Sequence, residues 1–153
     1  MRSSLLLLCM FALRCATSAP IDACALLTAA DIEQVQGEAP EETKRSDAQC
    51  FYRLPTFAKS VSLSATRMSH EEWERMFEKR EGEEGEGEEH EARPRPVSGI
   101  GDEALWSPLP IGATLYVRDG RRMLRVSIGG NDPDAVRQQK AVELARRALA
   151  RLR

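Results

Sequence analysis

Apolar and polar positions alternate along the chain with two different periods, which predict strands in some segments and helices in others. Residues 60–66 repeat with a period of two, because Val61, Leu63 and Ala65 are separated by serines, and this pattern is typical of a half-buried strand. Residues 49–54 are rich in aromatic and apolar side chains and predict a strand just before it. The two segments therefore predict consecutive strands joined by a turn.

Three segments carry helix signals. Residues 28–36 and a segment that starts at Ser69 each begin with a capping box, Thr-Ala-Ala-Asp and Ser-His-Glu-Glu. Gly37 is a natural stop for the first helix, whereas the second is expected to fade into the glutamate-rich run from Glu81. Residues 133–152 predict a long third helix with Asp132 as its N-cap. Helical spacing gives this last helix one apolar face, made of Ala141, Val142, Leu144, Ala145, Ala148, Leu149 and Leu152.

The strongest local signal is a hairpin formed by residues 113–118 and 121–128. Asp119-Gly120 separates the two alternating runs and predicts a type I′ turn, since both residues tolerate a positive φ. Leu115 and Val117 are expected to face the same side as the apolar residues of the second strand, which are Leu124, Val126 and Ile128.

The remaining segments predict loops and one weaker strand. Residues 38–47 are polar and predict a loop, whereas residues 97–106 predict an extended segment that bends at the glycines of 99–101. Residues 107–110, Ser-Pro-Leu-Pro, predict a turn. The resulting order is α-β-β-α-(β)-β-β-α, which predicts an α+β fold with an antiparallel sheet packed by about three helices.

The N-terminus has the pattern of a secretory signal peptide over residues 1–19. Arg2 precedes an apolar run at residues 5–13, and small residues follow at 16–19, so cleavage is expected after Ser18 or Ala19. The apolar run is too short to span a bilayer, which takes about 20 residues. Attachment of a lipid at Cys15 or Cys24 is a weaker alternative, because neither cysteine follows the small residues that lipid attachment requires.

Residues 20–153 then predict one domain, of which Cys24 and Cys50 are the only cysteines. Two cysteines in an exported chain predict one disulfide. A zinc site is the alternative, but two thiols without nearby histidines lack the ligands that zinc needs. The chain is therefore expected to be exported, either to a periplasm or to the outside.

Charge is distributed unevenly along the chain. Residues 71–91 hold eleven acidic and three basic side chains, whereas residues 92–153 hold six acidic and twelve basic ones. Residues 81–92 include a glutamate- and glycine-rich run, for which we expect a low-complexity loop. The formal net charge of −2 argues against a nucleic-acid partner.

No catalytic constellation is recognisable, so we expect neither enzymatic activity nor a cofactor or metal. His70 lies in a capping box and His90 in the acidic run, and no Gly-x-Ser-x-Gly elbow occurs. The glycines at 99 and 101 match part of a dinucleotide fingerprint, but Asp102 and Glu103 follow them and would repel phosphates. A glycosidase needs two carboxylates held rigidly in a cleft, and a flexible glutamate run cannot provide them.

The hairpin carries the most specific binding hypothesis. On the face opposite its apolar residues, the pattern gathers Tyr116, Arg118, Arg121, Met123 and Arg125. Arginine suits carboxylates and phosphates, so this basic and aromatic patch is the candidate surface for a partner. The alternative is a face without a role in binding, either solvated or covered by the C-terminal helix.

Several motifs of the chain resemble certain bacterial exported domains of unknown function, many of them lipoproteins. The motifs are DACALLTAADIEQVQGEA, QCFYRL, GIGDEALW, LYVRDG and LRVSIGG. Some related domains form a PsbP/Mog1-like sandwich, which the predicted order permits. The resemblance implies a fold and an exported location, with no activity attached.

Two functional hypotheses follow from these observations. The first is an exported, non-enzymatic binding module whose hairpin patch meets an acidic protein, an anionic component of the cell envelope, or the chain's own acidic run as a lid. The second is a structural, envelope-associated protein that binds no small molecule. Neither hypothesis requires a transmembrane segment in the mature chain.

Overall fold

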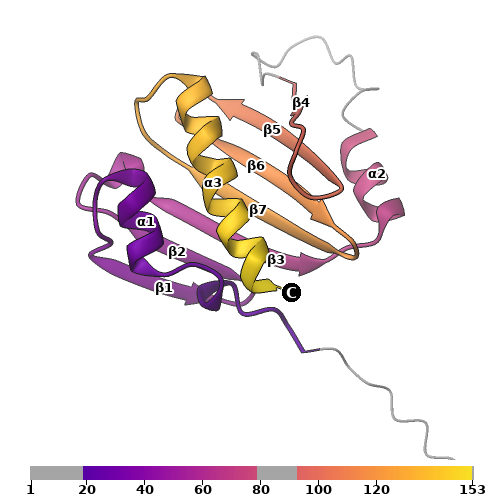
Figure 1. Cartoon of the computed structure of the whole chain (residues 1–153), viewed down its shortest axis with the longest axis horizontal. Coiled ribbons are helices and arrows are strands. Elements are labelled where there is room, and N and C mark those ends of the chain that lie inside the picture. The colour runs from indigo at the N-terminus through magenta and orange to yellow at the C-terminus, as the bar shows by residue number, and fades with distance from the viewer. Residues whose placement is uncertain (1–18, 79–92, 153) are drawn as a thin grey trace, which may run out of the picture.

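The computed structural model describes residues 19–78 and 93–152. Seven antiparallel strands form one sheet in the order β1-β2-β3-β7-β6-β5-β4, as Figure 1 shows. The strands are β1 (Glu42–Ser46), β2 (Gln49–Arg53), β3 (Val61–Arg67), β4 (Arg95–Pro96), β5 (Glu103–Leu109), β6 (Gly112–Asp119) and β7 (Arg122–Ile128). The helices are α1 (Ala29–Gln36), α2 (His70–Glu78) and α3 (Asp134–Leu152), with short 3-10 turns η1 (Ala23–Ala25) and η2 (Phe57–Lys59).

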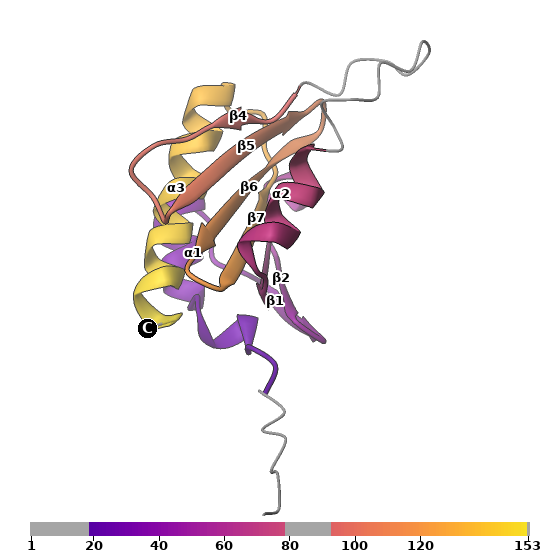
Figure 2. The ribbon, with the colours of Figure 1, turned by 90° about the vertical axis from the view of Figure 1, so that its right-hand side faces the viewer.

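The helices lie on both faces of the sheet. Figure 2 views the sheet from its side and shows α1 and α3 against one face and α2 against the other. The expected α+β fold, with its antiparallel sheet and helices, is confirmed, as is the expected order of elements. Predicted turns and loops also proved to contain two further strands, β1 and β4.

The core lies between the sheet and the pair α1 and α3. The hairpin residues predicted to face inward do so, and the first residues of β3 lie beside them in register, with Val61 opposite Ile128 and Leu63 opposite Val126. Helix α3 buries five of its seven predicted apolar residues against this layer, namely Ala141, Leu144, Ala145, Ala148 and Leu149. Periodicity thus predicted which side of β3, β6, β7 and α3 faces the core.

The disulfide predicted between Cys24 and Cys50 is present, with a Cα–Cα distance of 5.0 Å. It joins η1 to the second residue of β2 and so holds the segment before α1 against the sheet. The Tyr52 hydroxyl, which is buried on the same strand, donates to the backbone carbonyl of Leu27 at 2.9 Å. The two links act at the same place, where the chain enters its first helix.

The helix ends match the capping signals. Thr28 and Asp31 form a reciprocal capping box, and Gly37 ends α1 with φ 80°, a value that glycine adopts without strain. Ser69 and Glu72 bond to each other's backbone amides at the start of α2. The first two helix boundaries were therefore readable from the sequence.

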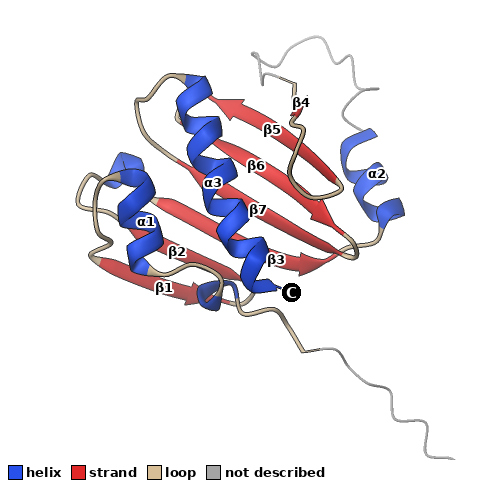
Figure 3. Ribbon diagram, viewed as in Figure 1, coloured by secondary structure: helices blue, strands red, loops and turns tan. Residues whose placement is uncertain are grey.

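The predicted loop over residues 38–47 was wrong, because β1 occupies half of it. This strand pairs only with β2 and is exposed along most of its length, so it has no buried face to produce an alternating pattern. Its charges suit an edge strand, since they discourage pairing with another chain. Figure 3 shows β1 at one edge of the sheet.

The predicted turns beside β6 were also misplaced. Residues 107–109 belong to β5, where Pro108 is tolerated because β4 pairs only with Leu105 and Trp106 and leaves the rest of β5 as an edge. In the hairpin, Asp119 pairs with Arg122, so the two loop residues are Gly120 and Arg121. Gly120 has φ 62° and Arg121 does not have a positive φ, which corresponds to a type II′ turn.

The loop from 97 to 102 bends at its two glycines, as expected. Gly99 and Gly101 have φ 79° and 59°, and a Cβ at Gly101 would lie 2.5 Å from the backbone oxygen of Arg118. The backbone amide of Asp102 donates to that same oxygen at 2.8 Å. Close packing against β6 therefore requires glycine here, and it holds the loop rigidly beside the sheet.

Candidate functional site

The structure places four of the five predicted patch residues on the face that carries α2. Tyr116 lies opposite Arg125, and Arg118 lies opposite Met123; directly paired residues of antiparallel strands share a face. Arg121 belongs to the turn instead, because the two loop residues are Gly120 and Arg121 and not the predicted Asp119 and Gly120. The sheet therefore brings four of the predicted residues together on one face, where Met123 is buried, and the exposed Arg121 lies in the adjacent turn.

Helix α2 covers part of this patch. Trp73 is 4% exposed and Met123 is 7% exposed, although neither belongs to the main core. The Trp73 and Phe77 rings lie 4.5 Å apart, and Phe77 meets the Tyr116 ring edge-on at 5.2 Å. The expected alternative of a cover by the C-terminal helix is wrong, since α3 packs on the opposite face.

Arg118 is bound within the protein through both terminal nitrogens of its guanidinium, while its buried Nε has no partner among the described residues. Its guanidinium donates to Glu103 at 2.9 Å, to Asp102 at 3.3 Å and to the carbonyl of Gly120 at 3.0 Å. The side chain is 12% exposed. Because two carboxylates already compensate its charge, Arg118 ties the hairpin turn to β5 and contributes little positive charge to the surface.

Arg125 has a different environment. It is exposed and lies over the Tyr116 ring with its guanidinium carbon 5.8 Å from the ring centroid, within the range of a cation–π contact. Among the described residues it forms no ion pair. Within residues 19–78 and 93–152 its positive charge is therefore uncompensated, and the ring restricts where the side chain can lie.

Register places hydrogen-bonding side chains beside Arg125. Gln49 lies opposite Ser64, Ser64 opposite Arg125, and Arg125 opposite Tyr116. We call these four residues the Arg125 row. Neighbouring Cβ atoms in such a row lie about 5 Å apart, so amide, hydroxyl and guanidinium donors form a line across four strands.

A second line of hydroxyl groups runs parallel to the Arg125 row. Ser62 lies opposite Ser127, and Ser127 lies opposite Thr114, whose hydroxyl is 3.0 Å from that of Ser127. Serine alternation in β3 was visible in the sequence, but its continuation into β7 and β6 depends on register. Thr114 is buried and its hydroxyl is bonded to that of Ser127, so this second line is partly satisfied within the sheet.

The described residues offer no metal site and no recognisable catalytic pair. No group of three or more histidine, cysteine, aspartate or glutamate side chains converges on one point within residues 19–78 and 93–152. His70 lies between Glu74, at 3.1 Å, and Glu103, at 3.5 Å, with one ring nitrogen toward each. It thus links the start of α2 to β5. His90, the acidic run and the segment up to residue 18, for which a signal peptide is predicted, lie outside the described residues.

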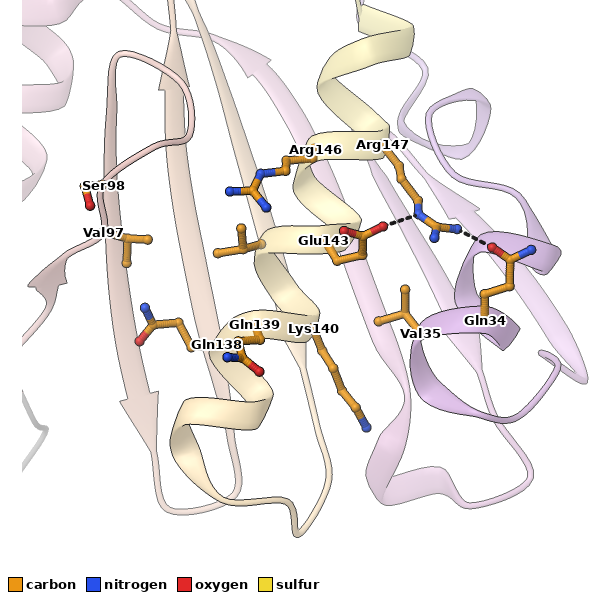
Figure 4. A pocket seen from close by; sticks show the side chains of 11 residues that line it. Gln34, Val35, Val97, Ser98, Gln138, Gln139, Lys140, Glu143, Arg146 and Arg147 are labelled. Atoms are coloured by element: carbon orange, nitrogen blue, oxygen red, sulfur yellow. Dashed lines mark hydrogen bonds and ion pairs between the residues drawn. The ribbon is translucent and has the colours of Figure 1, made fainter.

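A hollow that sequence reasoning missed lies on the other side of the molecule. It has a volume of about 590 Å³ and lies among α1, α3 and the loop at 97–102, as Figure 4 shows. Its lining comprises Gln34, Val35, Val97, Ser98, Gln138, Gln139, Lys140, Val142, Glu143, Arg146 and Arg147. The only sequence signal for this hollow was the spacing of residues 138, 142 and 146, which places them on one side of α3.

Within the part of the chain that the structure covers, no helix has the length and apolarity needed to cross a bilayer. Comparison with known proteins found no family model that matches the chain and no significantly similar curated protein. The resemblance to exported bacterial domains therefore stays a prediction, and the functional argument depends on the site itself.

Proposed function

We propose that this protein is an exported, non-enzymatic binding module that recognises an acidic segment of a protein partner through the Arg125 row. The observation that carries the proposal is the contrast between Arg118 and Arg125. Arg118 is compensated by Asp102 and Glu103, whereas Arg125 is exposed and pairs with no described carboxylate. An arginine beside hydrogen-bond donors is well suited to a carboxylate.

The geometry of the row supports an extended acidic ligand. Ser64 and Gln49 continue the row beyond Arg125 toward the edge strand β1. A carboxylate on Arg125 could accept further hydrogen bonds from the Ser64 hydroxyl, and backbone carbonyls of the ligand could accept from Gln49. Tyr116, held by Phe77 of α2 at 5.2 Å, forms the apolar border of the surface.

Export is supported by the disulfide. The Cys24–Cys50 bond joins the entry of the domain to its sheet, and such bonds persist in oxidising compartments. Together with the signal-peptide pattern of residues 1–19, it favours a periplasmic or secreted protein. The intact mass of the native protein tests this part, since cleavage after residue 18 or 19 and loss of two thiol hydrogens are both expected.

The binding proposal can be tested with a defined acidic probe. A fluorescein-labelled peptide of ten glutamates is titrated with the mature protein at physiological salt, and a peptide of ten glutamines serves as the uncharged probe. Binding is followed by fluorescence anisotropy. We expect binding of the glutamate peptide and an affinity at least tenfold lower for Arg125→Gln.

Arg67→Gln is the matched control, because Arg67 is also exposed, also lacks an ion pair among the described residues, and belongs to neither binding surface proposed for the protein, so that its substitution removes the same charge elsewhere. We expect this variant to change the affinity less than twofold. Equal losses in both variants would show a general charge effect and contradict the proposal. Failure of the unaltered protein to bind the glutamate peptide would also reject it and would favour the structural, envelope-associated hypothesis.

A further inference from the structure

The hollow beside α3 is divided by the helix into two flanks. Residues 138, 142 and 146 recur at every fourth position and therefore line one side of α3, toward the loop at 97–102. Lys140 and Arg147 point to the other side, toward α1, as Figure 4 shows. The two flanks differ in how their charges are compensated.

The flank toward α1 is occupied by contacts within the protein. Arg147 donates to Glu143 at 2.9 Å, to Asp31 at 3.1 Å and to Gln34 at 2.7 Å. Lys140 bonds to Asp132 at 2.6 Å. Arg147 thus holds α1 against α3, and Lys140 is paired with the residue that lies just before α3, so that both charges on this side are compensated.

The flank toward the loop carries an uncompensated charge above an apolar floor. We call it the α3 groove, formed by Val97, Ser98, Gln138, Val142 and Arg146. Val97 and Val142 are half-buried and pack on the core. Arg146 is exposed and forms no ion pair with any described residue.

The other end of the groove carries an amide. The side-chain oxygen of Gln138 accepts a hydrogen bond from Arg95 at 3.0 Å, so the orientation of the amide is fixed and its NH₂ group remains available as a donor. The loop wall is also held in place, since the Val97 amide donates to the Ala104 carbonyl at 2.9 Å and Ile100 is buried in the core. A groove with fixed walls needs little ordering on binding.

We propose that the α3 groove binds a short extended peptide that presents an apolar side chain followed by a carboxylate. The carboxylate pairs with Arg146, the apolar side chain packs on Val97 and Val142, and a ligand carbonyl accepts from Gln138. Positions 138 and 146 are about 12 Å apart along the helix axis, which corresponds to three or four residues of extended chain. This site is separate from the Arg125 row and lies on the opposite face of the sheet.

The carboxylate of the proposed ligand is the C-terminal one, because it directly follows the last side chain and can pair with Arg146 while that side chain packs on Val97 and Val142. Three fluorescein-labelled peptides are compared by anisotropy with the mature protein: Gly-Ala-Val-Ala-Leu with a free C-terminus, the same peptide amidated, and amidated Gly-Ala-Val-Leu-Glu. We expect both amidated peptides to bind at least tenfold more weakly than the peptide with the free C-terminus. Equal or tighter binding of the amidated glutamate peptide would overturn the assignment to a chain terminus.

Two variants test the location. Arg146→Gln is expected to lower the affinity at least tenfold, whereas Arg67→Gln, which removes the same charge at an exposed position outside both proposed sites, changes it less than twofold. Ser98→Trp fills the groove from an exposed position and is expected to abolish binding, while an unchanged circular dichroism spectrum shows that the fold persists.

Equal effects of the two arginine variants, binding that survives Ser98→Trp, or three peptides that bind alike or not at all would each overturn the proposal. The glutamate and apolar peptides test different arginines. Failure at one site therefore leaves the result at the other site interpretable.

Discussion

The two faces of the sheet are built differently, although the same strands form both. On one face, α1 and α3 lie over a continuous core that includes Trp106, which is fully buried. On the other face, α2 covers only part of the strands, and it does so mainly through Trp73 and Phe77. The chain has two tryptophans, and each face carries one of them.

Hydrogen bonds and ion pairs between segments that are distant in the sequence occur mainly on the face covered by α1 and α3. The Trp106 indole N–H donates to Asp134 at the start of α3 at 2.9 Å, and Arg151 near its end bonds to Asp31 of α1 at 2.8 Å. The α2 face has the His70 contacts and an aromatic cluster. The main core and most long-range links therefore lie on one face, whereas polar side chains of the other face, such as Gln49 and Arg125, stay exposed.

The largest effect is expected from removing each tryptophan in turn. Trp106→Ala should lower the free energy of unfolding by about 3–5 kcal/mol, because it leaves a cavity in the core and an unpaired Asp134 oxygen. Trp73→Ala should lower it by about 1 kcal/mol, because α2 can detach without global unfolding. Urea denaturation measures both. Equal losses would show that α2 is part of the cooperative core.

The next effect concerns the disulfide. The double variant Cys24→Ala and Cys50→Ala should lower the free energy of unfolding by about 3 kcal/mol, since the bond closes a loop between residues 26 positions apart. Thermal and urea unfolding of the oxidised protein and the variant give the difference. A variant as stable as the parent would mean that the Tyr52 hydrogen bond and the ion pairs alone hold α1 in place.

An alkaline effect should follow from Tyr52. Burial, with smaller contributions from Asp31 and Asp22, raises the pKa of Tyr52 to about 12. The unfolded chain loses this proton near pH 10, so the stability it confers is complete below about pH 10 and is lost as the pH rises toward 12. The parent protein should therefore lose about 2–3 kcal/mol of its free energy of unfolding over this pH range, and Tyr52→Phe should not show this loss. Urea unfolding from pH 8 to 11.5 measures it, and parallel curves would contradict the assignment.

The smallest effect is expected at Asp31. Burial raises the pKa of Asp31, but hydrogen bonds from Thr28, Arg151 and Arg147 outweigh it and hold the pKa well below its ordinary value. A lowered folded pKa gives stability that is present at neutral pH and is lost as the pH falls below about 4. Asp31→Asn should therefore be about 1 kcal/mol less stable than the parent at pH 7. The difference should shrink at pH 2, and a constant difference in unfolding experiments would argue against the ion pair.

Much of the fold was predictable because its signals are local. The capping boxes at Thr28 and Ser69, the alternation of β3 and β6, and the apolar face of α3 each depend on residues close in sequence. The strand β1 was not predictable by this route, because it is exposed on both sides and leaves no periodic pattern. The Gly120–Arg121 turn was missed for another reason, since Asp119-Gly120 satisfies the local rules equally well and pairing along the whole hairpin decided the register.

The candidate site was predictable only in part. Alternation placed Tyr116, Arg118, Met123 and Arg125 on one face, and the structure agrees. Which arginine keeps its charge was not readable, because Arg118 is compensated from β5 and Arg125 is not. The packing of Trp73 and Phe77 on this face was equally unpredictable, since the amphipathic pattern of a helix does not indicate which face of a sheet the helix packs against.

By itself, the sequence determined the class of the fold, the Cys24–Cys50 pair and the inner face of most elements, because hydrophobic periodicity and cysteine count are properties of the chain alone. Only the tertiary structure decided which charges remain available. Asp31 and Arg147 lie 116 positions apart and still meet, whereas Arg125 and Arg146 meet no described carboxylate. Charge compensation acts through space, so it depends on which distant segments the fold brings together.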